Sequence, residues 1–264
     1  MGFLTDFVTE RRRALLDRPL DHVALAAAAA TAPEPRNLAW TLRGYARADG
    51  VAVIAEVKRA SPSAGAIAID ADPVIQATAY DVGGAAVISV LTEPTHFGGS
   101  MQDLRAVRAA VEHPVLRKDF LVDPDEILEA RAAGADAVLL ISSCLSDDEL
   151  IRMIAVAREL GMEPLVETYT DEDLQRVLAT DAEVVGVNAR DLESLDVDVA
   201  AALRRLARIG DDRVAVLESG IRTRADVAAA VAAGASAILV GETLMRAADP
   251  GAAIRELIHG KEQP

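Results

Sequence analysis

The sequence predicts a (β/α)8 barrel in a single domain, residues 1–264, of which residues 1–50 form a helical N-terminal extension. Three observations support this prediction. Eight short apolar runs recur after residue 50, amphipathic stretches separate them, and no linker-like composition interrupts the series. Strands this apolar that alternate with helices indicate a parallel sheet buried on both faces. Eight such units in about 200–250 residues are typical of the barrel.

The eight runs are rich in Val, Ile, Leu and Ala, as buried strands are. They are VAVIAEV from residue 51, AAVISVL from 85, PVLRK from 114, DAVLLI from 136, PLVET from 164, EVVGVN from 183, VAVLES from 214 and SAILVG from 236. Helical stretches lie between them at 100–111, 146–160 and 222–233, and Ser146 with Glu149 forms a capping-box signature. The rival fold is an open doubly wound sheet, but the first strand-to-helix turn has no G-x-G-x-x-G.

Residues 1–50 predict three helical pieces separated by proline. An apolar stripe at helical spacing begins at Phe3 and ends before Pro19, an Ala-rich helix continues to about Ala30, and a third piece covers residues 38–48. We favour the interpretation that this extension packs against the main body. The alternative hypothesis is that it caps one mouth of the barrel and helps to close the site.

Two further expectations concern side chains of the extension. We expect Trp40 to be a packing residue. We expect the charged run Glu10 to Arg13 to be a solvated helix face.

The composition limits the class of protein. With 51% hydrophobic and 26% charged residues, the chain has the composition of a globular protein. A net charge of −15 argues against a nucleic-acid or anionic-membrane surface, although a local basic pocket can still take an anionic substrate. Cys144 is the only cysteine, so no intrachain disulfide is possible. We find no membrane-length apolar run and no signal-peptide pattern, and we expect a cytoplasmic location.

Long polar side chains finish five of the eight runs. They are Glu56 and Lys58, Arg117 and Lys118, Glu167, Asn188 and Arg190, and Glu218 and Ser219. In a barrel, the C-terminal ends of all strands open on the face that carries the active site. For any one of these residues, the simpler interpretation is that it is polar because strand ends are exposed to solvent. Lysines and glutamates converging from several strands must share one mouth, where they can shift one another's pKa values for proton transfer.

The last two strand-to-helix turns predict a phosphate site. ESGI leads into a helix that starts near Arg222, and VGETLM begins a short helix before Pro250. Free backbone N–H groups at such glycine turns bind phosphate, and this is the usual place for it in the barrel. We expect phosphate at Ser219, Gly220, Gly241 and Glu242, with the Glu242 carboxylate pointing away. The alternative is that these are ordinary turn glycines.

Taken together, these motifs resemble the indole-3-glycerol-phosphate synthase family of tryptophan biosynthesis. The matching segments, in family order, are AEVKRASPSAG, ISVLTEPTHFGGS, LRKDFLVDP, ADAVLLI, LVET, GVNARDL, ESGI and VGETLM. They cover the chain from about Val51 to Leu257. The N-terminal FLTDFVTERRRALL also resembles the extra helix of that family.

The resemblance implies ring closure of 1-(2-carboxyphenylamino)-1-deoxyribulose 5-phosphate with loss of CO2 and water. It implies that Lys118 is the general acid, with a pKa that burial and neighbouring charge can tune downward. Glu167 would stabilise the positive charge created by ring attack. Lys58 would hold the substrate carboxylate and act in the dehydration, and Glu56 would take part in proton transfer and set the charge of Lys58.

The remaining implied contacts are with the substrate alone. Asn188 and Arg190 would hold the carboxylate and a sugar hydroxyl, Glu218 a hydroxyl, and Ser61 would lie near the carboxylate. The apolar walls would be Phe97, Phe120, Leu139 and Leu192. The phosphate would lie at Ser219, Gly220, Gly241 and Glu242, with Lys58 nearby. The resemblance implies no metal and no organic cofactor, a small anionic substrate as the only partner, no nucleic acid or membrane, and a monomer.

Several alternatives remain open. The chain could be another phosphosugar barrel enzyme with a Schiff-base lysine, a non-catalytic phosphometabolite-binding homologue, or a copy serving a specialised indole pathway. We expect Cys144 to be a small buried residue, which weighs against phosphoribosylanthranilate isomerase, a related barrel with a cysteine near the end of its first strand. We expect His96 to be a loop histidine and the other histidines to form no metal cluster.

Overall fold

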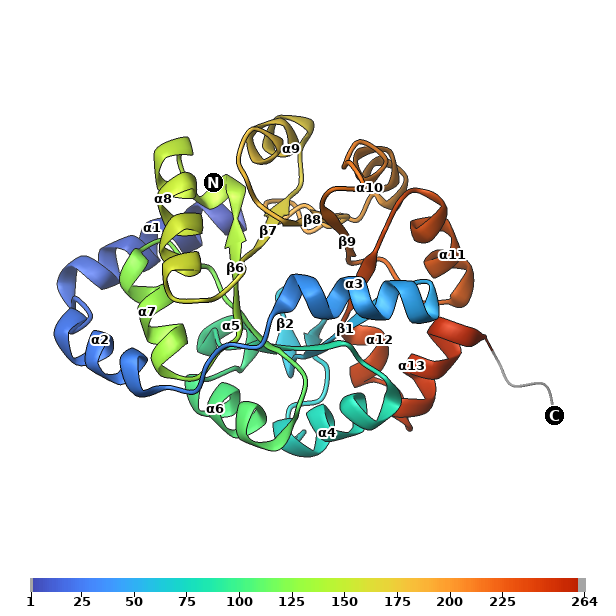
Figure 1. Ribbon diagram of the computed structural model, residues 1–264, viewed down its shortest axis with the longest axis horizontal. Coiled ribbons are helices and arrows are strands. Elements are labelled where there is room, and N and C mark those ends of the chain that lie inside the picture. The colour runs from blue at the N-terminus through green and yellow to red at the C-terminus, as the bar shows by residue number, and fades with distance from the viewer. Residues whose placement is uncertain (1, 261–264) are drawn as a thin grey trace.

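The computed structural model describes residues 2–260 and shows a closed barrel of parallel strands surrounded by helices (Figure 1). Around the barrel the strands follow the order β1-β10-β9-β8-β7-β6-β5-β4. Their bounds are β1 Ala52–Val57, β4 Val87–Leu91, β5 Val115–Lys118, β6 Ala137–Ile141, β7 Leu165–Thr168, β8 Val184–Asn188, β9 Val214–Glu218 and β10 Ala237–Val240. Each of the eight predicted runs contains one of these strands, so the predicted fold is confirmed.

Helices cover the outside of the barrel. They are α4 Pro73–Gly83, α5 Pro94–Phe97, α6 Met101–Ala110, α7 Pro124–Ala132, α8 Asp147–Glu159, α9 Asp171–Leu178, α10 Val199–Leu206, α11 Arg224–Ala232, α12 Glu242–Met245 and α13 Pro250–His259, with a 3-10 turn η1 at Ser142–Cys144. The predicted capping box begins α8: Glu149 N–H donates to Ser146 Oγ, and Ser146 N–H donates to Glu149 Oε2. None of the helices in residues 2–260 has the length and apolarity needed to cross a bilayer.

Strand register determines which side chains meet inside the barrel. Glu167 on β7 pairs with Gly186 on β8, and Asn188 on β8 pairs with Glu218 on β9. Residues paired across parallel strands point to the same face, so these side chains enter the interior together. A Cβ on Gly186 would lie 2.3 Å from Glu218 Oε1, so the glycine makes room for that carboxyl group.

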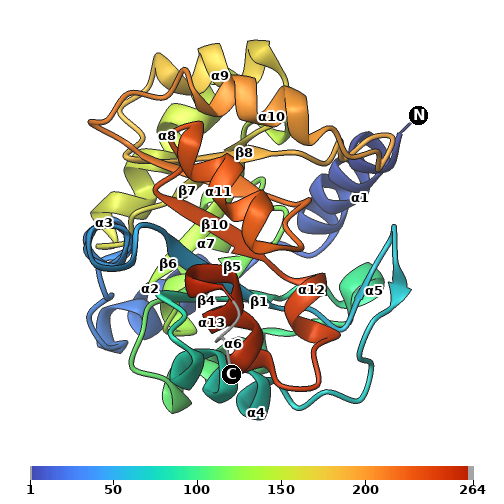
Figure 2. The ribbon, with the colours of Figure 1, turned by 90° about the vertical axis from the view of Figure 1, so that its right-hand side faces the viewer.

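The N-terminal segment forms α1 Phe3–Asp17, α2 His22–Thr31 and α3 Leu38–Asp49, as predicted. Figure 2 shows α1 and α3 at opposite ends of the barrel. Helix α3 lies at the end where the strands begin, because Arg43 bonds the Asp212 carbonyl and pairs with Glu183, just before β9 and β8. Helix α2 packs along α7. Packing against the body therefore describes α2 and α3, whereas α1 lies at the C-terminal mouth.

Two arginines anchor α1 to the loops at that mouth. Arg11 Nε donates to Glu126 Oε1 at 2.7 Å, and its Nη2 lies 3.9 Å from Asp119 Oδ2. Arg12 pairs with Glu149 at 2.9 Å. The prediction that Glu10 to Arg13 form a solvated face is therefore wrong for Arg11 and Arg12. The charge pattern of one helix gives no sign of a carboxylate 115 residues away.

Trp40 is not a packing residue, since 72% of its surface is exposed. The buried face of α3 consists of Leu38, Ala39 and Leu42. Residue 40 lies about 200° around the helix from residue 38, on the opposite side. The helical spacing of the apolar residues therefore predicts an exposed Trp40, whereas the general tendency of tryptophan to be buried led to the wrong expectation.

A small hairpin follows β1 and was not predicted. Its strands are β2 Ala60–Ser61 and β3 Gly65–Ala66. Arg59 holds the base of the hairpin, pairing with Asp103 at 2.7 Å and donating to the Gly98 carbonyl at 2.9 Å. The hairpin places Ser61 at the C-terminal mouth of the barrel, among the residues that line the cavity there.

The anchoring of α1 predicts an effect on stability. Replacing Arg11 with Met leaves the buried Glu126 carboxylate without its ion-pair partner. We expect the free energy of unfolding to fall by about 3 kcal/mol, at the lower end for a broken buried pair because Arg11 is partly exposed.

The matched control is Arg13→Met on the same helix. Arg13 and its partner Asp17 are both largely exposed. Its removal is expected to cost less than about 0.5 kcal/mol in urea unfolding. Equal losses for the two variants would contradict the anchoring role of Arg11.

Candidate active site

A cavity of about 450 Å³ opens at the C-terminal mouth of the barrel. Every residue predicted for the site lines it. They are Glu56, Lys58, Ser61, Phe97, Lys118, Phe120, Leu139, Glu167, Asn188, Arg190, Leu192, Glu218, Ser219, Gly220, Gly241 and Glu242. The barrel thus brings together residues from all eight strands and from the loops that follow them.

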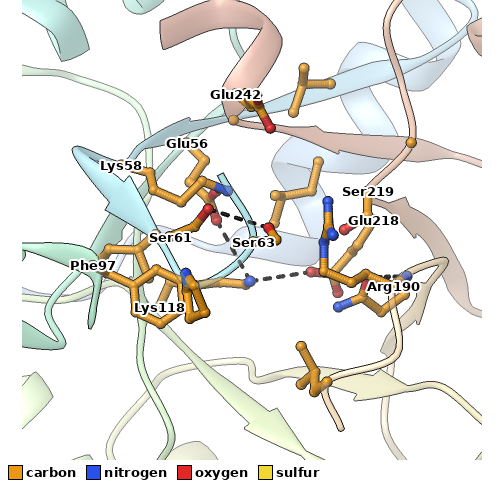
Figure 3. Close-up of a pocket in the computed structure, with 18 of the residues that line it drawn as sticks. Glu56, Lys58, Ser61, Ser63, Phe97, Lys118, Arg190, Glu218, Ser219 and Glu242 are labelled. Atoms are coloured by element: carbon orange, nitrogen blue, oxygen red, sulfur yellow. Dashed lines mark hydrogen bonds and ion pairs between the residues drawn. The ribbon is translucent and has the colours of Figure 1, made fainter. Parts of the chain in front are cut away.

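Lys118 reaches into this cavity, and Figure 3 shows its side chain between Glu56 and Glu218. Its Nζ lies 3.6 Å from Glu56 Oε2, 3.8 Å from Glu167 Oε2 and 3.6 Å from Glu218 Oε2. All three carboxyl groups are buried. One ammonium group is therefore the shared counter-charge of three strand ends.

This arrangement sets the protonation state of Lys118. Burial alone lowers the pKa of the ammonium, but the negative charges of Glu56, Glu218 and Glu167 outweigh it, so the pKa of Lys118 is raised. The expected downward shift is therefore wrong. Motif matching identified the lysine but could not count the carboxylates around it. Near neutral pH the group holds its proton and can act as an acid.

The surroundings of Glu218 favour its neutral, protonated form. Its pKa is raised well above the ordinary glutamate value, first by burial and then by the neighbouring charge of Glu167. Asn188 Nδ2 donates to Glu167 Oε1 at 2.9 Å and holds that neighbour in place. A buried acid beside another acid retains a proton more readily, which reduces the excess of negative charge around Lys118.

Glu56 and Lys58 form a second, tighter pair. Lys58 Nζ lies 2.5 Å from Glu56 Oε1. Burial raises the pKa of Glu56, but Lys58 and Lys118 outweigh burial and the net pKa is lowered. Gly241 makes room for the pair, since a Cβ there would lie 2.3 Å from Glu56 Oε1. Glu56 is therefore an ionised bridge between the two lysines.

A group of free backbone donors lies on the other side of the cavity. The N–H groups of Ser219, Gly220, Gly241 and Glu242 have no acceptor within residues 2–260. Ser219 and Gly220 both have positive φ, 67° and 78°, a strained conformation for serine. We call these four N–H groups the anion seat, because unpaired donors at glycine turns bind oxyanions. The Glu242 carboxylate accepts from Arg246 Nε at 2.9 Å.

An apolar wall faces the polar groups. The rings of Phe97 and Phe120 lie 6.0 Å apart, centroid to centroid, and Leu139 and Leu192 also line the cavity. Phe3 of α1 meets Phe120 edge-on at 6.2 Å and reaches the same cavity. The wall can therefore hold an aromatic ring by stacking and edge contacts.

Two polar residues are fixed at the rim. Arg190 Nη1 donates to the Leu195 carbonyl at 2.7 Å, and Arg190 N–H donates to Asn188 Oδ1 at 2.9 Å. Ser61 Oγ accepts from Ala64 N–H at 3.1 Å and lies 3.4 Å from Ser63 Oγ. Arg190 thus keeps part of its guanidinium free for an anion.

Sequence reasoning missed several residues that line the cavity, among them Phe3, Asp119, Arg222 and Arg246. Phe3 lies at the N-terminal end of the chain, and no local pattern links it to the site. Arg246 follows Glu242 by one helical turn, a spacing that could have found it. One signal in the sequence was also overlooked. The chain has 24 arginines but only three lysines, Lys58, Lys118 and Lys261, and two of the three line the cavity. Lysine, unlike arginine, can exchange its proton, so its rarity elsewhere would have marked this pair.

The residues set aside as structural lie outside the cavity lining. Cys144 is buried, as expected, and burial raises the pKa of its thiol. His96 belongs to the short helix α5, and its ring meets Phe3 and Phe7 of α1 at 5.2 and 5.7 Å. In the described residues, no group of three or more His, Cys, Asp or Glu side chains is arranged to hold a metal ion.

Comparison with known proteins agrees with this geometry. The family model for indole-3-glycerol phosphate synthase matches residues 5–257. The indole-3-glycerol phosphate synthase of Rhodopirellula baltica is 49% identical over 260 residues, covering 98% of this chain and 99% of that protein. The indole-3-glycerol phosphate synthase of Mycobacterium tuberculosis strain H37Rv is 49% identical over 238 residues, covering 90% and 86%.

Solved structures at lower identity share the barrel. A 3-hexulose-6-phosphate synthase aligns with a TM-score of 0.63 at 20% identity, covering 80% of this chain and 99% of that one. At this identity the likeness concerns the fold alone. The family match and the two relatives go further: the chain belongs to the indole-3-glycerol phosphate synthase family.

Proposed function

We propose that Lys118 is the general acid of an indole ring closure on 1-(2-carboxyphenylamino)-1-deoxyribulose 5-phosphate. As a member of its family, the chain is a carboxy-lyase of tryptophan biosynthesis with indole-3-glycerol phosphate synthase activity. The assignment of roles to residues is our proposal. The observation that supports it is an ammonium group surrounded by three buried carboxylates, in a cavity with an anion seat.

The substrate has three parts that match three regions of the cavity. We place its phosphate on the anion seat of Ser219, Gly220, Gly241 and Glu242, near Lys58. The anthranilate ring lies against the wall of Phe97, Phe120, Leu139 and Leu192. The ribulose chain then runs between them, past Lys118. Because both ends of the substrate are fixed in this way, its ring carbon and its carbonyl carbon are held close enough to react.

Lys118 acts in the first step. The ring carbon that bears the carboxylate attacks the ribulose carbonyl carbon, a carbon–carbon bond forms, and the carbonyl oxygen takes a proton from Lys118. A raised pKa suits this transfer, because the developing alkoxide is a stronger base than the amine. The ring system becomes positive, and the Glu167 carboxylate, held by Asn188, stabilises that charge. Loss of CO2 then restores the aromatic ring.

The Glu56–Lys58 pair acts in the dehydration. Lys58 first holds the substrate carboxylate, and after CO2 has left it can deliver a proton to the departing hydroxyl group. Glu56 accepts the proton that the intermediate loses in the same step. The lowered pKa of Glu56 keeps its carboxylate ionised, and its 2.5 Å contact with Lys58 keeps that lysine charged. Water leaves and the indole ring is complete.

The other polar residues orient the substrate. We assign the substrate carboxylate to Arg190 and Ser61, and sugar hydroxyl groups to Asn188 and Glu218. The partly free guanidinium of Arg190 supports its assignment. Glu218, with its raised pKa, can donate a hydrogen bond to a hydroxyl oxygen.

We also propose that the chain acts as a cytoplasmic monomer without a cofactor, as one domain over residues 1–264 with residues 1–50 as its extension. Phe3 of the extension lines the cavity together with residues of the barrel. Leu38 and Leu42 belong to the same buried core as the barrel strands. The net charge of −15 argues against nucleic-acid or anionic-membrane partners.

A Schiff-base aldolase is disfavoured by the same geometry. Imine formation needs a neutral amine. The carboxylates around Lys118 raise its pKa and favour the ammonium form.

The role of Lys118 predicts the effect of two substitutions. We expect Lys118→Ala to lower kcat by at least about 10²-fold, the scale of general acid catalysis. Lys118→Arg keeps the positive charge among the carboxylates but does not release a proton, and we expect a loss of similar size. Indole product is followed by fluorescence under saturating substrate. Wild-type rates in the arginine variant would rule out proton donation by residue 118.

The raised pKa of Glu218 predicts a pH-dependent effect on stability. Below the unfolded-state pKa both states carry the proton, so Glu218→Gln changes little. As the pH rises, the unfolded chain ionises while the folded protein resists, and the wild type loses stability that the neutral glutamine keeps. We expect Glu218→Gln to gain stability over the wild type between pH 5 and pH 8 while losing activity.

Urea unfolding at the two pH values measures this difference. The control is Glu172→Gln, an exposed glutamate on α9, for which we expect the same small difference at both pH values. The quantity to compare is the free energy of unfolding of Glu218→Gln minus that of the wild type. If this difference is no larger at pH 8 than at pH 5, burial does not penalise the Glu218 carboxylate.

A further inference from the structure

Arg246 lines the cavity next to the anion seat but has no role in the scheme above. We propose that Arg246 binds the substrate phosphate directly through its Nη groups, and that Glu242 holds the guanidinium in position. This inference rests on the proposed function, because it assumes that the anion seat takes the phosphate. It adds a second charged side chain, beside Lys58, to the four backbone donors of the anion seat.

The charge balance of the cavity requires such a group. A phosphate monoester carries close to two negative charges near neutral pH, and backbone N–H groups provide only partial positive charge. The two lysines of the cavity already face carboxylates, Lys58 at 2.5 Å and Lys118 at 3.6 to 3.8 Å. Glu242 also lines the cavity, and its carboxylate would repel a nearby phosphate unless it is neutralised.

The geometry around Arg246 meets this requirement. Its Nε donates to Glu242 Oε1 at 2.9 Å, an i,i+4 contact that fixes the guanidinium plane. The Nη groups have no acceptor among the described residues, so the fork remains available. Glu242 provides both the carboxylate that holds the arginine and one N–H of the seat. The side chain of Arg246 is about half exposed and thus accessible to a ligand. Guanidinium forks match phosphate oxygens in shape and charge.

Arg222 is the natural comparison. It also lines the cavity, but within residues 2–260 no carboxylate lies within ion-pair distance of its guanidinium. A side chain without such a contact must lose more conformational freedom to bind. We therefore expect Arg222 to contribute less than Arg246.

The first test compares single variants. Arg246→Met is expected to raise KM for the anilino-ribulose phosphate about tenfold, and the inhibition constant of inorganic phosphate similarly, with most of the loss in KM rather than kcat. Arg246→Lys should recover part of the affinity. Arg222→Met should give a smaller increase. Arg224→Met, an exposed arginine that does not line the cavity, should match the wild type.

The second test separates direct contact from charge neutralisation. If Arg246 only neutralises Glu242, the double variant Arg246→Met, Glu242→Gln regains wild-type KM, which would overturn the proposal. If Arg246 touches the phosphate, the double variant stays weak. With a substrate that lacks the phosphate group, wild type and Arg246→Met should have equal kcat/KM. A remaining tenfold difference with this substrate would also overturn the proposal.

A binding measurement keeps this inference separate from the proposed activity. Titration of inorganic phosphate, followed by phosphorus NMR, needs no turnover. Weaker phosphate binding in Arg246→Met than in Arg224→Met supports the inference even if no indole product forms. Equal binding in the two variants refutes it even if the wild type is fully active.

Discussion

The contact between Lys118 and three carboxylates is the interaction on which the site depends. It joins the ends of β1, β5, β7 and β9, which are far apart in the sequence. Without this ammonium the buried glutamates would ionise less readily beside one another, and without the glutamates the ammonium would lose its proton more easily. The barrel keeps them together by register, by Gly186 beside Glu218 and by Gly241 beside Glu56. Stability of the mouth and acidity of the lysine are therefore set by the same contacts.

The N-terminal extension supports this centre from outside. Arg11 binds Glu126 and approaches Asp119, the residue that follows Lys118 in the chain. Asp119 also accepts from Arg117 and Thr92, so the segment after β5 is held by buried charges as well as by packing. Phe3 and Phe7 then pack against Phe120. A helix far from these strands in the sequence thus supports both the segment beside Lys118 and the aromatic wall.

Much of this was predictable from the sequence. Apolar runs and their polar ends predicted the strands, the mouth and the charged residues of the cavity, because strand direction in a parallel barrel sends every C-terminal end to one face. The apolar wall of Phe97, Phe120, Leu139 and Leu192 was expected only from the family resemblance. Charge partners were less predictable. The Arg11–Glu126 contact and the number of carboxyl groups at Lys118 depend on distances between segments, which no local pattern encodes. The Arg246–Glu242 pair, by contrast, has the local i,i+4 spacing and was overlooked. Trp40 differs from the long-range contacts, because the local helical spacing alone predicts that its side chain is exposed to solvent.

The most direct test of this account is an NMR titration of the lysine side chains. The chain has only three lysines, so selective labelling gives three signals. The account predicts that Lys118 remains an ammonium at higher pH than a free lysine, whose pKa is about 10.4, and that Glu56→Gln brings its titration to lower pH. A Lys118 signal that titrates below the free lysine in the wild type would contradict the central claim.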